Sequence, residues 1–106
     1  MPISLDQLKA AAPLKTATIQ VEGLESLGQI TMREMSFAEQ RKYAELGKEN
    51  AVEGIAWVLS TCVDGLAGLT VDDLNDLNPT VTGKLTTEVF RLSGLLPEDN
   101  EALEGN

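Results

Sequence analysis

The 106-residue chain contains no histidine and a single cysteine, Cys62. A lone cysteine cannot form a disulfide within the chain, and without histidine it offers neither a common zinc site nor a Cys–His catalytic pair. Cys62 lies in the apolar run "IAWVLSTCV", which is typical of a buried, small hydrophobic residue. No metal and no cofactor are therefore expected.

Basic residues are also scarce. The chain has eight lysines and arginines and seventeen acidic residues, which gives a net charge of −9. Residues 64–106 alone account for −7 of this charge. Proteins that bind nucleic acid or anionic membranes need clustered positive charge, and this chain has no such cluster. We expect a soluble protein with a protein partner, without nucleic acid or membrane.

Long apolar runs and a leader are missing as well. No stretch approaches the roughly 20 apolar residues of a membrane span, and the opening "MPISLDQLKAAAPLK" lacks a basic start followed by an apolar run. A reducing cytoplasm is the expected compartment. Aromatic residues make up only 4 % of the chain, so aliphatic side chains must form most of one modest core.

The patterning predicts a small single α+β domain: an N-terminal antiparallel β-hairpin packed with three to four α-helices. Residues 1–14 are expected to be an N-terminal arm or a short helix that Ser4 caps. Residues 15–96 form the domain, and residues 97–106 an acidic flexible tail. Residues 16–22 and 29–34 alternate apolar and polar residues, which predicts two strands joined by a turn over residues 23–28.

Helix signals fill the middle of the chain. Ser36 and Glu39 have the spacing of a capping box, so a helix should begin there and end near Gly47. The segment of residues 51–63 is apolar almost all round from Ile55 to Val63, a pattern that fits either a buried helix or a buried strand. Their length favours a central core helix with Trp57 substantially buried.

The acidic joint after this segment suggests calcium at first sight, because Asp64, Asp72 and Asp73 lie close in sequence. An EF-hand loop, however, needs oxygen ligands at alternate positions, and those after Asp64 are not carboxylates. The better interpretation is a turn followed by a short helix that Thr70 caps, with Asp73 at its third position.

A last helix should start at the cap Asn78, with Pro79 in its first position, and end at Gly94. Its core-facing stripe is expected to consist of Val81, Leu85, Val89 and Leu92. Leu95 and Leu96 are expected to fold back over its last turn.

Catalysis is not expected. Ser60 and Thr61 have no histidine to activate them, and the paired carboxylates fall in predicted turns or helix starts without a cleft to shift their pKa values. The sequence therefore predicts a non-enzymatic protein.

The order of these features resembles the tail assembly chaperones of long-tailed, siphovirus-like bacteriophages and prophages. The resemblance covers residues 15–106, through the hairpin, the helix start "REMSFAEQRKY", the apolar central helix and "DGLAGLTVDDLNDLNPTVTGKLTTEVFRLSGL" with its acidic end. It implies a transient factor of the infected or lysogenic host cytoplasm, absent from the mature virion. Such a factor holds the tape measure protein soluble and helps the tail tube protein assemble around it.

In many members of that family a programmed frameshift adds a C-terminal domain, and this chain would match the shorter product. The resemblance supplies no catalytic residues. The candidate partner-binding residues are Phe90, which lies off the apolar stripe, with Leu95 and Leu96; closing the core is the other role open to them. A homo-oligomer is left open. The alternative function is a small acidic regulatory or inhibitor protein that binds a host protein.

Overall fold

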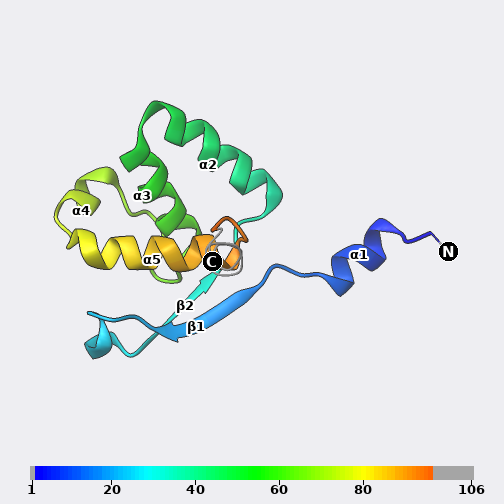
Figure 1. The fold of residues 1–106 in the computed structure, drawn as a ribbon, viewed down its shortest axis with the longest axis horizontal. Helices are drawn as coiled ribbons and strands as arrows, with labels where there is room; N and C mark the ends of the chain where they lie inside the picture. The colour runs from blue at the N-terminus through cyan, green and yellow to red at the C-terminus, as the bar shows by residue number, and fades with distance from the viewer. Residues whose placement is uncertain (1, 97–106) are drawn as a thin grey trace, which may run out of the picture.

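The structure is a computed structural model that describes residues 2–96. Within that range the chain forms a small α+β domain, as the sequence predicts: a two-stranded antiparallel hairpin is followed by helices gathered on one side of it (Figure 1). The predicted acidic tail, residues 97–106, lies outside the described residues. The elements in chain order are α1 (Leu5–Ala11), β1 (Thr16–Gln20), the short 3-10 helix η1 (Glu25–Leu27), β2 (Gln29–Arg33), α2 (Phe37–Glu49), α3 (Ala51–Cys62), α4 (Val71–Asn75) and α5 (Pro79–Leu92).

The hairpin has the predicted faces. Ile19 pairs with Ile30 across the strands, and the apolar face continues to Met32 and Val21, which are both buried. Each strand is shorter than expected, because β1 ends at Gln20 and β2 at Arg33. On its other side β2 meets Val63 in an isolated antiparallel bridge with Met32, so the end of the central helix is joined to the hairpin.

The predicted end of the second helix at Gly47 is wrong. Helix α2 continues to Glu49, and Asn50 then serves as its C-cap and as the N-cap of α3. The close approach of the two helices rests on Gly54 of α3, where an added Cβ would lie 3.4 Å from the Gly47 Cα and 3.2 Å from the Tyr43 ring. A Cβ added at Gly47 itself would meet no atom within 4 Å, so Gly54 is the glycine on which the packing of α2 against α3 depends.

The core lies between the apolar face of the hairpin and helices α3 and α5. Residues 51–62 are helical, which confirms the central helix, but Trp57 is only partly buried because it lies at the edge of the core. Of the predicted stripe on α5, Leu85 and Val89 are buried and Val81 and Leu92 partly buried. The largest side chains with less than 2 % exposure are Met32, Met35, Leu59, Val58 and Val89.

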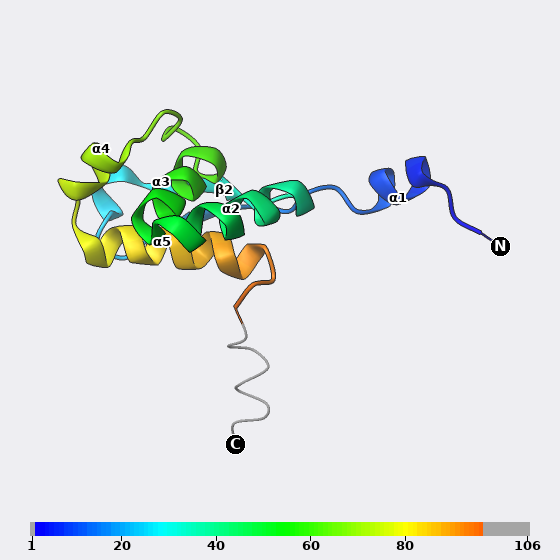
Figure 2. The ribbon, with the colours of Figure 1, turned by 90° about the horizontal axis from the view of Figure 1, so that it is seen from above.

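Helix α1 extends away from the rest of the domain (Figure 2). Ser4 caps it through a capping box with Gln7, yet none of its residues is buried. Within the predicted N-terminal segment, the described part therefore forms a short helix that does not pack on the domain. The arm is attached through Lys15, whose backbone N–H donates to Glu34 Oε2 at 2.7 Å and whose carbonyl accepts from the Glu34 N–H at 2.9 Å.

The joint between α3 and α5 follows the predicted turn and cap. Gly65 and Gly68 adopt φ values of +93° and +88°, where glycine is favoured, and Thr70 caps α4 in a capping box with Asp73. Asn78 caps α5 with Pro79 in its first turn. Among the residues described, no helix is both long and apolar enough to cross a membrane.

Candidate functional site

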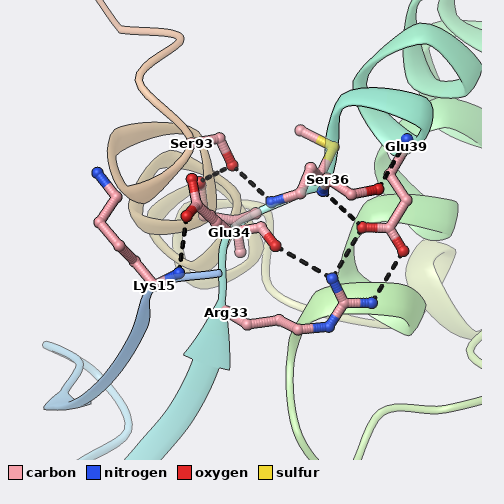
Figure 3. A network of polar contacts seen from close by, with 8 residues as sticks. Lys15, Arg33, Glu34, Ser36, Glu39 and Ser93 are labelled. Atoms are coloured by element: carbon pink, nitrogen blue, oxygen red, sulfur yellow. Dashed lines mark hydrogen bonds and ion pairs between the residues drawn. The ribbon is translucent and has the colours of Figure 1, made fainter. Parts of the chain in front are cut away.

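The junction between β2 and α2 is built around one bidentate ion pair. The Arg33 guanidinium donates to the two carboxylate oxygens of Glu39 at 2.8 and 2.9 Å (Figure 3). The same carboxylate accepts the Ser36 N–H at 2.8 Å, while the Ser36 hydroxyl accepts the Glu39 N–H at 3.2 Å. A side chain that the sequence identifies only as half of a capping box therefore also fixes the angle between strand and helix.

This arrangement changes the acidity of the pair. The hydrogen bond from Arg33, followed by the contacts with Ser36, lowers the pKa of Glu39 from 4.5 to about 2. In turn, the bond to Glu39 raises the pKa of Arg33. Both groups are charged at neutral pH, so the junction is held by a charge-assisted pair that is only partly exposed.

A second set of bonds fastens the end of α5 to the same junction. The Met35 N–H donates to Ser93 Oγ at 2.9 Å, and that hydroxyl donates to the Val89 carbonyl at 2.8 Å. Gln40 Nε2 of α2 donates to the Ser93 carbonyl at 3.3 Å. Because Met35 and Ser93 are 58 positions apart in the sequence, no local pattern points to this clamp.

The three candidate partner-binding residues lie at this clamped end of α5, in different environments. Phe90 packs its ring against Tyr43, with centroids 5.2 Å apart and planes at 60°, and so contributes to closing the core. The chain then turns at Gly94, where φ is +74°, and the Leu95 N–H donates to the Phe90 carbonyl at 2.9 Å. Leu95 is 41 % exposed and Leu96 is partly buried. The predicted fold-back thus occurs in the backbone, but it leaves Leu95 facing solvent.

A further apolar residue at this end was missed as a site candidate. Phe37 is the first residue of α2, directly after the Ser36 cap, and 79 % of it is exposed. One helical turn later, Gln40 bonds Ser93, so the first turn of α2 lies beside the last turn of α5. The sequence signal was available, since Phe37 is a large apolar residue directly after the Ser36 cap. We call Phe37, Phe90, Leu95 and Leu96 the clamp-end surface.

A second feature is a groove between the end of β1 and the outer face of α5. It has a volume of about 550 Å³. Glu22 and Lys84 form an ion pair across it at 2.8 Å, and the hydrogen bond from Lys84 lowers the pKa of Glu22. Glu88 also pairs with Arg91 along the helix. The strand side of the groove is lined by the apolar residues Ile19 and Val21, and Gly83 leaves space on the helix side.

Three residues that the sequence offers as candidates for chemistry, Asp73, Cys62 and Ser60, are in structural contacts or buried. Nowhere in residues 2–96 do three or more His, Cys, Asp or Glu side chains gather in a way that could hold a metal ion. Asp73 instead accepts the Thr70 N–H in the helix cap at 3.1 Å. Burial raises the pKa of Cys62 to about 11, so its thiol is protonated at neutral pH. Ser60 Oγ accepts the Gly68 N–H at 3.3 Å, which places this hydroxyl in a turn contact.

Comparisons with known proteins give no relative: no protein-family model, no curated protein and no solved structure matches this chain.

Proposed function

We propose that this protein is a non-enzymatic tail assembly chaperone of a long-tailed bacteriophage or prophage. It binds the tape measure protein, keeps it soluble and assists the tail tube protein in assembling around it. It acts in the cytoplasm of the infected or lysogenic bacterial host and is absent from the mature virion. The order of hairpin, capped helix, apolar central helix and punctuated last helix supports this proposal.

The observation that carries the proposal is the clamp-end surface. Phe37 and Leu95 expose apolar side chains at one end of the domain, with 79 % and 41 % of their surfaces accessible. The clamp through Ser93 holds the backbone beneath them in place. Exposed apolar side chains on a rigid base are typical of a site that receives a helix from a partner.

The net charge of −9 supports the same function. An unassembled tape measure protein is long and helical and exposes apolar seams. A bound factor of high negative charge makes such a complex repel its own copies, which opposes aggregation. We therefore propose that the clamp-end surface binds the tape measure protein and that the acidic remainder of the chain keeps the complex soluble.

Co-expression with the cognate tape measure protein tests the proposal. We expect the soluble fraction of the tape measure protein to rise when this chain is present, and a complex to co-purify. Leu95→Asp should abolish both effects. The matched control is Leu27→Asp, because Leu27 is an exposed leucine, at 67 %, in the hairpin turn.

If intact protein leaves the tape measure protein insoluble and no complex co-purifies, the chaperone function is refuted. The acidic regulatory or inhibitor class then becomes the leading hypothesis. If both leucine variants retain full activity, the chaperone function stands and the clamp-end surface is refuted as its binding site.

A further inference from the structure

Strand β1 has one edge that carries no partner within residues 2–96. The sheet has two strands, and β2 is the only neighbour of β1 in it. The Glu34 N–H donates to the Lys15 carbonyl, so Lys15 is in a hydrogen-bonded pair with β2. In an antiparallel ladder such pairs alternate with pairs whose backbone groups point away. The N–H and C=O groups of Thr16, Thr18 and Gln20 therefore point to the open edge.

The second edge of the hairpin confirms this alternation. Thr31 faces Thr18 across the strands, and its carbonyl accepts the Asp64 N–H at 2.9 Å on the side away from β1. The two threonine hydroxyls lie 3.0 Å apart, as expected for the close, non-hydrogen-bonded type of pair. Thr18 and Thr31 thus occupy equivalent exposed positions, one on the open edge and one on the inner strand.

The open edge lacks the usual protection against pairing. Natural edge strands carry charged side chains, proline or a bulge that prevents a second strand from adding. The exposed side chains of β1 are Thr16, Thr18 and Gln20, none of which is charged or proline. A second copy can add to this edge in antiparallel orientation about a two-fold axis at Thr18, with Thr16 opposite the partner's Gln20. This pairing of the two β1 strands is self-complementary, as a two-fold interface requires.

The same symmetry brings the arm of one copy to the groove of the other. Antiparallel pairing places the start of one β1 beside the end of its partner, so the residues before Thr16 run past the partner's Gln20 and Glu22. Those two residues line the groove between β1 and α5. The groove volume of about 550 Å³ has room for several leucine side chains.

The arm carries exposed apolar side chains that fit the apolar part of the groove lining. Ile3, Leu5, Leu8 and Leu14 are between 46 % and 72 % exposed. A helix of seven residues is marginal in water unless packing covers its apolar face. The charge of the arm is complementary to that of the domain: residues 2–15 carry a net +1, whereas residues 16–96 carry a net −6.

We propose that the protein forms a two-fold dimer in which β1 pairs with the partner's β1 and each N-terminal arm lies in the partner's β1–α5 groove. The four strands then form one continuous sheet. This inference does not rest on the proposed chaperone function, since it is argued from the hairpin, the arm and the outer face of α5.

Analytical ultracentrifugation of the full chain tests the dimer with a matched pair of variants. Thr18→Lys places two like charges opposite each other at the two-fold axis, and we expect it to raise the dimer dissociation constant at least tenfold. Thr31→Lys loses the same hydroxyl contact within the hairpin, but it lies one strand farther from the axis and should leave the dimer intact. Wild-type protein that stays monomeric up to hundreds of micromolar, or equal effects of the two lysines, would overturn the proposal.

Disulfide trapping gives the register. Thr18→Cys should form a covalent dimer on mild oxidation, because paired Cα atoms in adjacent strands lie within disulfide range. Thr31→Cys should not, since two further strands separate it from its symmetry mate. Covalent dimer from both variants or from neither refutes the register.

The arm is tested separately by Leu8→Asp, with Val52→Asp as control because Val52 is exposed on α3 at 41 %. Weakened association of Leu8→Asp alone supports exchange of the arms. Equal association of both variants shows that the arm lies in its own groove or on another protein, and refutes the exchange.

Discussion

Replacing Glu39 by glutamine removes one charge while leaving the helix cap in place, because glutamine also functions at the third position of a capping box. The pKa of Glu39 is about 2 in the folded protein, against 4.5 ordinarily. A tenfold change in the proton affinity of a group corresponds to about 1.4 kcal/mol. The ion pair therefore contributes at most roughly 3.4 kcal/mol to the free energy of unfolding. The side chains of Arg33 and Glu39 remain 32 % and 24 % exposed, so solvent screening reduces the expected contribution to about 1–2 kcal/mol.

The pH dependence follows from the direction in which the pKa changes. Since the folded state lowers the pKa of Glu39, the ionised pair stabilises the fold fully above about pH 4.5 and loses this effect as pH falls towards 2. The difference between wild type and Glu39→Gln should therefore be constant near pH 7 and fall to less than half of that value by about pH 3. The other carboxylates titrate in both proteins and cancel in the comparison.

Urea unfolding followed by the fluorescence of Trp57 measures this difference at each pH. Glu22→Gln is the control, because Glu22 also forms an ion pair, with Lys84, but its side chain is 82 % exposed. We expect a smaller effect from the control at every pH. A stability difference for Glu39→Gln that does not change between pH 7 and pH 3, or one no larger than the control's, would refute the role assigned to the pair.

The remaining predictions concern core packing, helix stability and access to the thiol. Leu59→Ala should lower the free energy of unfolding by about 2–5 kcal/mol, because Leu59 is fully buried, whereas Leu27→Ala in the exposed turn should change it by less than about 0.5 kcal/mol in urea titrations. Gly83→Ala should stabilise α5 by roughly 0.5–1 kcal/mol, since no atom lies within 4 Å of the added Cβ. Gly54→Ala should stabilise the protein less than Gly83→Ala or destabilise it, because the added Cβ would lie 3.2 Å from the Tyr43 ring. Equal shifts in thermal midpoint for the two variants would contradict the close crossing of α2 and α3. Cys62, with its pKa raised to about 11 by burial, should react with a thiol reagent at pH 8 only as fast as the protein unfolds, and fast labelling of native protein would show the thiol to be accessible.

The local order of this fold could be predicted from the sequence. Alternation of apolar residues in 16–22 and 29–34 identified both strands, and the caps at Ser36, Thr70 and Asn78 identified helix starts. These signals are short-range: a strand's period and a cap's side-chain bond involve residues at most a few positions apart.

The site depended on the tertiary structure. Arg33 bonds Glu39, Ser93 bonds Met35 and Gly54 lies close to the Tyr43 ring through contacts that only the packed chain creates. The sequence proposed Phe90, Leu95 and Leu96 as one group, but packing against Tyr43 assigns Phe90 to the core edge and leaves Leu95 exposed.

The sequence by itself determined which segments become strand or helix and where most of them begin, because backbone propensity and capping act within a few residues. Only the tertiary structure decided which apolar residues remain exposed, since burial depends on what packs against a side chain from distant parts of the chain. Phe37 illustrates the difference: its place in α2 was fixed by the Ser36 cap, while its 79 % exposure results from how α2 lies on α3 and α5.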